Sequence, residues 1–250
     1  MHVLLTNGGS KSLRGLWALR SAFISTGMNV LTVVSRTPSG TFESSDDHLQ
    51  IDVGGDVSNP IVHGSSTPAN CVRDAIGARG AGNIRLLVSG IQCARTGHHG
   101  RRAVEFAAAV EGARRGLAAL YVTATAFDDD VSLWRTAELA AELAALMYTE
   151  PRSDAVVHLD VPSRCQSLRP VLLPELKPRY FVDDANGSPI WRRGLEVAPA
   201  IGRHPTLRMK PIAEDPAESV AAADAWLSRL LNQLLPRLVG SADACGCCAS

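Results

Sequence analysis

The chain has 250 residues, and its hydrophobic content of 46% is enough for a sizeable core in one large domain or one domain with an appendage. The 25 Lys and Arg residues balance the 25 Asp and Glu residues, so net charge gives no support for binding nucleic acid or an anionic membrane. No apolar run approaches the roughly 18 residues of a membrane span, and no signal-peptide pattern opens the chain. We therefore expect a cytoplasmic protein. Six cysteines in a chain of this length do not predict a disulfide framework.

Short apolar runs alternate with helical patterns along the first 161 residues. Such βα alternation predicts an α/β fold with a Rossmann-like, mostly parallel sheet flanked by helices. The first helix begins near Leu13, and Gly27 is its expected stop. The expected strands are Val3–Thr6, Val30–Ser35, Ile84–Ser89, Ala119–Ala124 and Ala155–Val161, and the later helices are Val104–Gly116 and Leu133–Met147.

The chain changes character after residue 161. Prolines recur through 162–215, which predicts a β-rich extension of edge strands or hairpins and a possible oligomerisation region. Asn186-Gly187 is a strong hairpin signal. A leucine-rich stripe predicts the longest helix over 216–239, packed either on its own core or on a second subunit. The sequence therefore predicts four parts: an α/β core over 1–161, a β-rich extension over 162–215, a C-terminal helix over 216–239 and a flexible tail over 240–250. The tail contains Cys245, Cys247 and Cys248.

The loop after the first strand is a candidate ligand site. Parallel α/β sheets bind ligands where a strand ends and the next helix begins. Backbone N–H groups of Asn7, Gly8, Gly9 and Ser10 can cradle a phosphate there, with Lys11 adding a charge. The spacing does not fit a Walker A loop. A flexible strand-to-helix turn explains the same residues, and we favour it.

Several polar clusters have both a functional and a structural interpretation. His98-His99 with Cys93 can bind zinc, although a solvated loop is the simpler explanation. Asp128–Asp130 can supply metal oxygens or, as we favour, place first-turn charge on the dipole of the next helix. Asp46-Asp47-His48 can also supply metal ligands, and the cysteine tail is either a chelator or, as we favour, a frayed end. Of the basic pairs Arg101-Arg102 and Arg114-Arg115, the first can contact a phosphate, and we favour solvated helix faces for both.

Four short stretches in order resemble the SurE survival-protein family. Leu4–Asn7 is similar to the start of the family's LLTNDDG, Ser66–Val72 to GTPADCV, Leu87–Ile91 to LVVSGIN and Val110–Gly112 to the end of AMEG. Thr37–Gly40 stands where the family has a Ser-Gly turn, and His158–Pro162 and Gly187–Trp191 are weaker matches, the first to NVNVP. The similarity in order covers most of residues 1–215. It implies a SurE-like fold and a metal-dependent phosphatase or nucleotidase.

The resemblance also shows where this chain departs from the family. The family's divalent metal, Mg²⁺ or Mn²⁺, is held at positions that are Gly8, Gly9, Ser39 and Gln92 here, and only Ser39 is kept. Glycine offers no side chain, and Gln92 moves its carbonyl oxygen by one methylene. The family's Ser-Gly-Thr phosphate loop falls near Val104-Glu105-Phe106, where Glu105 would repel a phosphate.

Three functional hypotheses follow from this pattern. The first is a SurE-like phosphatase (5'/3'-nucleotidase) homologue, with a nucleoside monophosphate or other phosphate monoester as partner and with activity weak or absent because the metal positions are lost. The second is a non-catalytic nucleotide- or phosphate-binding or scaffold protein, using the Gly8–Ser12 loop with Arg95 or Arg101. The third is an active hydrolase with relocated ligands, from Asp128–Asp130 or His98-His99. The resemblance implies a homodimer or homotetramer.

Overall fold

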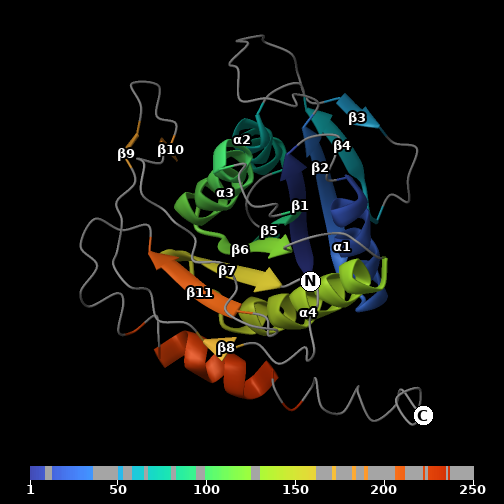
Figure 1. Cartoon of the computed structure of the whole chain (residues 1–250). Coiled ribbons are helices and arrows are strands. Elements are labelled where there is room, and N and C mark those ends of the chain that lie inside the picture. The colour runs from blue at the N-terminus through green and yellow to red at the C-terminus, as the bar shows by residue number, and fades with distance from the viewer. Residues whose placement is uncertain are drawn as a thin grey trace.

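The computed structural model describes residues 1–8, 13–35, 50–52, 58–64, 67–79, 83–93, 99–124, 130–161, 171–172, 182–183, 189–190, 206–211, 222, 225–234 and 236. Its centre is a sheet in the order β3-β4-β2-β1-β5-β6-β7-β11-β8. The six strands from β4 to β7 are all parallel, as the βα alternation predicts. Figure 1 shows helices on both faces of this sheet. The strands are β1 (His2–Gly8), β2 (Asn29–Ser35), β3 (Gln50–Asp52), β4 (Ile61–Gly64), β5 (Ile84–Cys93), β6 (Ala118–Ala124), β7 (Ala155–Val161), β8 (Val171–Leu172) and β11 (Thr206–Pro211).

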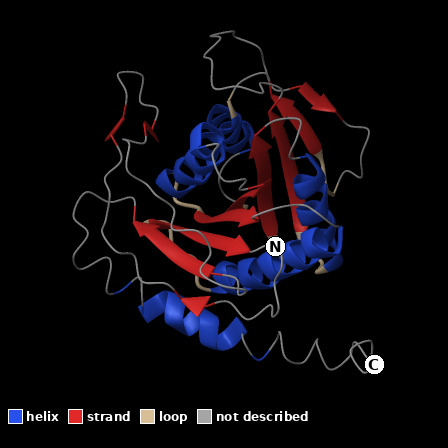
Figure 2. Ribbon diagram, in the orientation of Figure 1, coloured by secondary structure: helices blue, strands red, loops and turns tan. Residues whose placement is uncertain are grey.

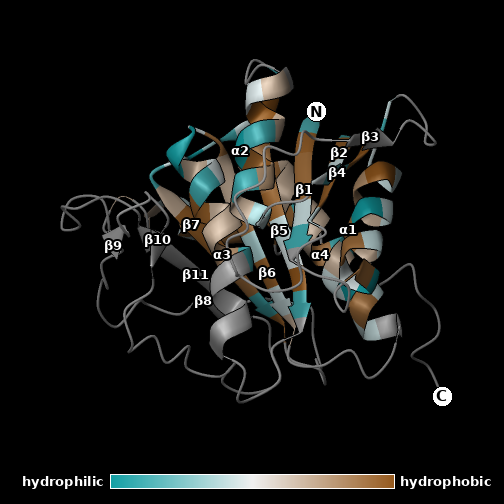
Figure 3. Cartoon of the chain, turned by 90° about the horizontal axis from the view of Figure 1, so that it is seen from above, coloured by the Kyte–Doolittle hydropathy of each residue, from teal (hydrophilic) through white to brown (hydrophobic). Residues whose placement is uncertain are grey.

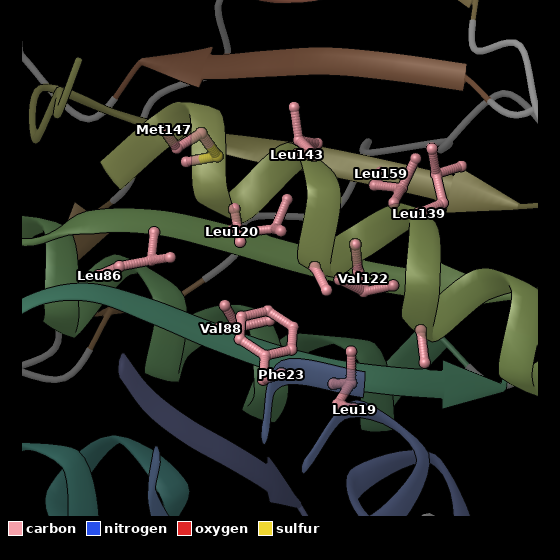
Figure 4. Packing of buried hydrophobic residues seen from close by; sticks show 14 of the residues in the cluster. Leu19, Phe23, Leu86, Val88, Leu120, Val122, Leu139, Leu143, Met147 and Leu159 are labelled. Carbon is pink, nitrogen blue, oxygen red and sulfur yellow. The ribbon is translucent and has the colours of Figure 1, made fainter. Parts of the chain in front are cut away.

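Among the described helices, two cover each face of the sheet. One face packs against α1 (Leu13–Ser25) and α4 (Asp130–Thr149), and the other against α2 (Pro68–Arg79) and α3 (His99–Arg114). Between α1, α4 and the sheet, Phe23, Val88 and Leu143 belong to one apolar cluster (Figure 4). The hydropathy view in Figure 3 shows brown, apolar stretches along the central strands, as expected of a parallel sheet buried on both faces.

Helix α1 shows how local sequence sets these boundaries. Its buried residues include Leu16, Leu19 and Phe23, spaced for one face of a helix. Gly27 has φ +78°, and the N–H groups of Gly27 and Met28 bond the carbonyls of Ile24 and Phe23. This C-terminal glycine cap is the stop that the sequence predicts.

Short strands occur among the described residues of the segment 162–215. β9 (Val182–Asp183) pairs with β10 (Pro189–Ile190) as an antiparallel hairpin, seen apart from the main sheet in Figure 2. The Asn186-Gly187 turn itself lies outside the described residues. The sequence predicts edge strands or hairpins in this segment, and β11 does not fit that prediction. It pairs with β7 on one side and with β8 on the other.

The C-terminal helix packs on the chain's own core. Trp226, Leu227, Leu230 and Leu234 join the cluster formed by α1 and α4, and Trp226 Nε1 donates to the carbonyl of Glu150 at 3.1 Å. Of the expected span 216–239, only 222, 225–234 and 236 are described. Among the described helices α4 is the longest, with 20 residues, and the full length of the C-terminal helix lies outside the described residues.

Other elements also differ from the sequence expectations. Helix α3 begins at His99 rather than Val104, because residues after Gly100 favour helix although they look polar and loop-like. Consequently His99 lies in a helix rather than on an extended loop, and Arg101-Arg102 lie in the same helix. β4 and α2 were not predicted at all. Yet α2 carries a recognisable start, with Pro68 in the first helical position and the Asn70 N–H 3.4 Å from Thr67 Oγ1.

Candidate functional site

The carboxyl ends of β1 and β5 form the candidate site. Strand order runs from β1 to β2 and β4 on one side and to β5, β6 and β7 on the other. The direction of the chain across the sheet therefore reverses between β1 and β5. Open α/β sheets place their ligands in the crevice beyond the strand ends at such a switch point. Asn7 and Gly8 end β1, and Gln92 lies one residue before the end of β5.

Asn7 ties the two strand ends together. Its side chain is 1% exposed, and Nδ2 lies 3.5 Å from the carbonyl oxygen of Ile91, a long and weak hydrogen bond. Gly8 is in register with Ser35 at the end of β2. The ends of β2, β1 and β5 therefore lie next to one another, at the loop that the sequence predicts as a candidate ligand site. Gly9, Ser10 and Ser39 lie outside the described residues.

Two glycines allow the backbone to pack closely behind this edge. A Cβ on Gly15 of α1 would lie 2.5 Å from the carbonyl oxygen of Ile91. Gly90 has φ +142°, and a Cβ there would lie 2.4 Å from the carbonyl oxygen of Val122. Both contacts are with backbone atoms that cannot swing away. The Ser89-Gly90-Ile91 motif is therefore explained by close packing of β5 against α1 and β6.

Gln92 faces the α3 side of the sheet. Its register partner on β6 is Thr123, whereas the preceding Ile91 belongs to the apolar cluster on the α1 and α4 side. The Gln92 side chain is 8% exposed, and its Oε1 atom accepts no hydrogen bond within the described part of the chain. A buried carbonyl without a partner is costly, which marks this atom as a candidate ligand contact.

Glu105 occupies the place expected for the family's phosphate loop. It lies in α3 and is 2% exposed, and its backbone carbonyl accepts a 2.8 Å hydrogen bond from Ser89 Oγ. This bond fixes α3 over the end of β5. An ionised carboxyl group at this position would repel an anion.

The Val110-Glu111-Gly112 motif has a packing role. Glu111 accepts hydrogen bonds from Nε of Arg73 in α2 at 3.0 Å and from Nε of Arg115 at 2.8 Å. Burial by itself would raise the pKa of Glu111, but these two arginines outweigh it and hold the pKa below its usual value. A Cβ on Gly112 would lie 2.3 Å from Leu87 Cδ2. The motif therefore joins α2, α3 and β5.

The sequence analysis did not predict a buried polar network that joins β6 and β7. Thr123 Oγ1 donates to Asp160 Oδ1 at 2.6 Å and lies 2.9 Å from His158 Nε2. His158 also stacks on Tyr121, with ring centroids 4.9 Å apart. His158 and Asp160 alternate with apolar residues in β7, and this was the signal that marked one polar face of the strand.

The residues at the family's metal positions do not fit a divalent metal. Gly8 contributes no side chain and Gln92 offers only a neutral carbonyl, whereas Mg²⁺ and Mn²⁺ are usually held by at least one carboxylate. Within the described ranges, no three His, Cys, Asp or Glu side chains come together as a metal site. Asp130 is the first residue of α4. Outside the described residues lie His98, Arg95, Asp46-Asp47-His48, Asp128, Asp129 and the cysteine tail.

Fold and site together define a Rossmann-like α/β protein with its ligand edge at the switch point between β1 and β5. The model of the family described as survival protein SurE matches residues 3–177, so the chain belongs to the SurE family. The crystal structure of the SurE protein from Aquifex aeolicus is similar, with a TM-score of 0.60 and 18% identity over 89% of this chain and 98% of that one. This likeness confirms the fold that the sequence predicts.

Another solved structure is a more distant match. A short-chain dehydrogenase/reductase variant from Serratia marcescens has a TM-score of 0.30 and 14% identity, over 64% of this chain and 77% of that one. No curated protein matches the sequence. None of the described helices is both long and apolar enough to cross a membrane.

Proposed function

We propose that this chain is a SurE-family protein that recognises phosphate monoesters, with nucleoside monophosphates as the first candidates, and whose turnover at the family's metal positions is weak or absent. Membership of the family supports the phosphatase class. We infer the loss of turnover from Gly8. This residue ends β1 in register with Ser35, and it places no carboxylate at the switch point. The metal supplies a Lewis acid and an activated water in such reactions, so its loss removes both.

The direct test is hydrolysis of a generic phosphate monoester and of nucleoside monophosphates, with Mg²⁺, Mn²⁺ or Zn²⁺ added in turn. We expect little or no turnover by protein that circular dichroism shows to be folded. Family-like rates with any of these metals would contradict the proposal. Metal content after purification would then show whether relocated ligands, such as Asp128–Asp130 or His98-His99, sustain the activity.

A second candidate function is binding without turnover. It is supported by the orphaned Oε1 of Gln92 and by Asn7, both buried at the strand ends where ligands collect. A ligand that binds only the folded state raises the melting temperature, so a thermal-shift screen of nucleotides and inorganic phosphate separates this function from a scaffold role. No shift with any phosphate compound would favour a scaffold. Mass measurement in solution tests the homodimer or homotetramer that the resemblance implies.

A further inference from the structure

A row of polar side chains crosses the sheet at its ligand edge. Gln92 of β5 is in register with Thr123 of β6, and Thr123 is in register with Asp160 of β7. Each of them is the last residue but one of its strand. Register partners on parallel strands project from the same face, which here is the face that α3 covers. We call Gln92, Thr123 and Asp160 the edge row.

The edge row is unusual for a buried parallel sheet. Its side chains are 8%, 3% and 5% exposed. The opposite face at the same level carries Val122, Leu159 and Val161, all members of the apolar cluster under α1 and α4. Parallel strands buried on both faces normally carry apolar residues on both. Buried polar groups are stable when they are hydrogen-bonded within the fold or to a ligand.

Thr123 and His158 hold the Asp160 carboxylate in place. The Thr123 hydroxyl has a single hydrogen, which it donates to Asp160 Oδ1 at 2.6 Å. The 2.9 Å contact between Thr123 Oγ1 and His158 Nε2 is then a bond that the imidazole donates. Stacking on Tyr121 restrains the His158 ring. The carboxylate is therefore oriented before any ligand arrives.

The edge row supplies hydrogen-bond acceptors at its two ends. Oε1 of Gln92 is buried and accepts no hydrogen bond from the described residues. An ionised Asp160 carboxylate has about four acceptor positions, and the Thr123 hydroxyl takes one of them. A chemical group that meets both ends must donate hydrogen bonds. Beside an ionised carboxylate it must also carry no negative charge.

These requirements fit a pair of sugar hydroxyls. Neighbouring strands lie about 4.8 Å apart, so Gln92 and Asp160 are separated by roughly 10 Å at the backbone. A sugar that donates one hydroxyl to each side chain, with O–H···O distances of about 2.8 Å, can span this separation. Each hydroxyl donates one hydrogen and carries no charge, so both ends of the row are satisfied without a cation.

The charges along the sheet also orient a phosphate ester. Glu105 of α3 is a buried acid on the same side as Asp160, and both disfavour a phosphate group over β6 and β7. Asn7 and Gly8, which end β1, bring no carboxylate. The phosphate of an ester bound at this edge is therefore expected near β1, with its sugar over β5 and the strands beyond.

We propose that the edge row binds the sugar hydroxyls of a phosphate monoester, with Gln92 and Asp160 as acceptors and Thr123 and His158 as positioning residues. This inference rests on the proposed function and names its substrate class, namely esters whose sugar carries two neighbouring hydroxyls, as ribonucleotides do. An acidic side chain binds a ribose hydroxyl in dinucleotide-binding sheets of related architecture.

The test compares adenosine monophosphate with 2′,3′-dideoxyadenosine monophosphate, which lacks both hydroxyls, by calorimetric titration of the full chain. The wild type should bind the first at least about tenfold more tightly, because two hydrogen bonds are lost with the second. Asp160→Asn and Gln92→Leu should each reduce this ratio and leave the affinity for the dideoxy compound unchanged. Glu138→Gln, which removes an exposed carboxylate on α4, is the control and should keep the full ratio.

Two further readouts separate these roles from a structural one. Thr123→Val should reduce the ratio, and Thr123→Ser, which restores the hydroxyl, should recover it. Without ligand, Gln92→Leu should melt no lower than the wild type, because it removes a buried carbonyl that has no partner. A lower melting temperature would show that the fold itself needs this amide, and would contradict its role as a ligand acceptor.

The inference and the proposed function fail in different experiments. Equal affinity of the wild type for the two monophosphates would overturn the sugar site and leave phosphate recognition standing. Adenosine and 2′,3′-dideoxyadenosine, which carry no phosphate, give the converse comparison. A preference for adenosine, in protein to which inorganic phosphate and monophosphates add no stability, would keep the sugar site and remove the proposed function. Binding of none of these compounds would overturn both.

Discussion

Glu111 of α3 accepts a 3.0 Å hydrogen bond from the Arg73 guanidinium of α2, and this ion pair joins the two helices that cover one face of the sheet. The Glu111 side chain is 7% exposed, whereas Arg73 is 41% and Arg115 is 36% exposed. Solvent screening of the partly exposed arginines reduces the strength of the pairs. Both arginines nevertheless stabilise the charged form of the Glu111 carboxylate.

Glu111→Gln should lower the free energy of unfolding by about 1–2 kcal/mol, because it removes the charge that both arginines contact. Urea unfolding followed by circular dichroism measures the change. Glu138→Gln, an exposed position on α4, is the control and should stay within about 0.5 kcal/mol of the wild type. An equal effect of both variants would show that the ion pairs contribute nothing specific.

The same pairs predict how stability depends on pH. The pKa of Glu111 in the folded protein lies below its ordinary value of 4.5. The unfolded chain binds more protons between these two values, so stability rises with pH there. The contribution is complete above 4.5 and is lost as the pH falls through the folded pKa. The hydrogen bond from Arg152 likewise holds the pKa of Asp154 below 3.8 and adds to the loss at lower pH.

Urea midpoints measured from about pH 7 down to about pH 3 should therefore fall less steeply in Glu111→Gln than in the wild type. Asp154→Asn should leave the Glu111 contribution unchanged, because the two acids lie in separate ion pairs. Parallel curves for the wild type and Glu111→Gln would contradict the assignment.

Gly15→Ala should destabilise the fold by about 1–3 kcal/mol, because the new methyl group meets the Ile91 carbonyl at 2.5 Å and pushes α1 away from β5. Gly77→Ala in α2 is the matched control. Nothing lies within 4 Å of its added methyl group, so this variant should be more stable by about 0.5–1 kcal/mol. Thermal unfolding of the two variants measures the loss of stability expected for Gly15→Ala and the gain expected for Gly77→Ala. A loss of stability in Gly77→Ala would contradict the prediction.

Leu230→Ala should cost about 2–5 kcal/mol, because Leu230 is fully buried where the C-terminal helix packs on the core. Leu231→Ala, one position along, should cost less because Leu231 is only partly buried. If the helix were held mainly by a second subunit, Leu230→Ala would change the mass in solution before it changed the unfolding of the monomer.

Gly8→Asp combined with Gly9→Asp should restore Mn²⁺ binding at the end of β1, because it returns the two charges that the family uses there. Gly8→Asp alone should bind more weakly than the pair. A double variant that binds no Mn²⁺ would show that the site has changed beyond these two positions, with Gln92 and Glu105 as the next residues to replace.

The sequence by itself determined the layers of the fold and its family. Apolar runs at strand spacing, helical stripes and the glycine stop at Gly27 are local features, so they predict β1, α1, β2, β6 and β7 without knowledge of any distant contact. The ordered motifs at residues 4–7, 66–72 and 87–91 likewise indicated SurE. The missing carboxylates at Gly8 and Gly9 are visible in the sequence as well.

Only the tertiary structure decided which residues share an environment. Gln92, Thr123 and Asp160 are far apart along the chain, and strand register alone brings them into one row. The roles of Glu111 and Gly112 depend on Arg73 and Leu87, which lie on other elements. The docking of the C-terminal helix on its own core also follows from long-range packing. Such contacts are set by the relative positions of packed elements, which no local pattern specifies.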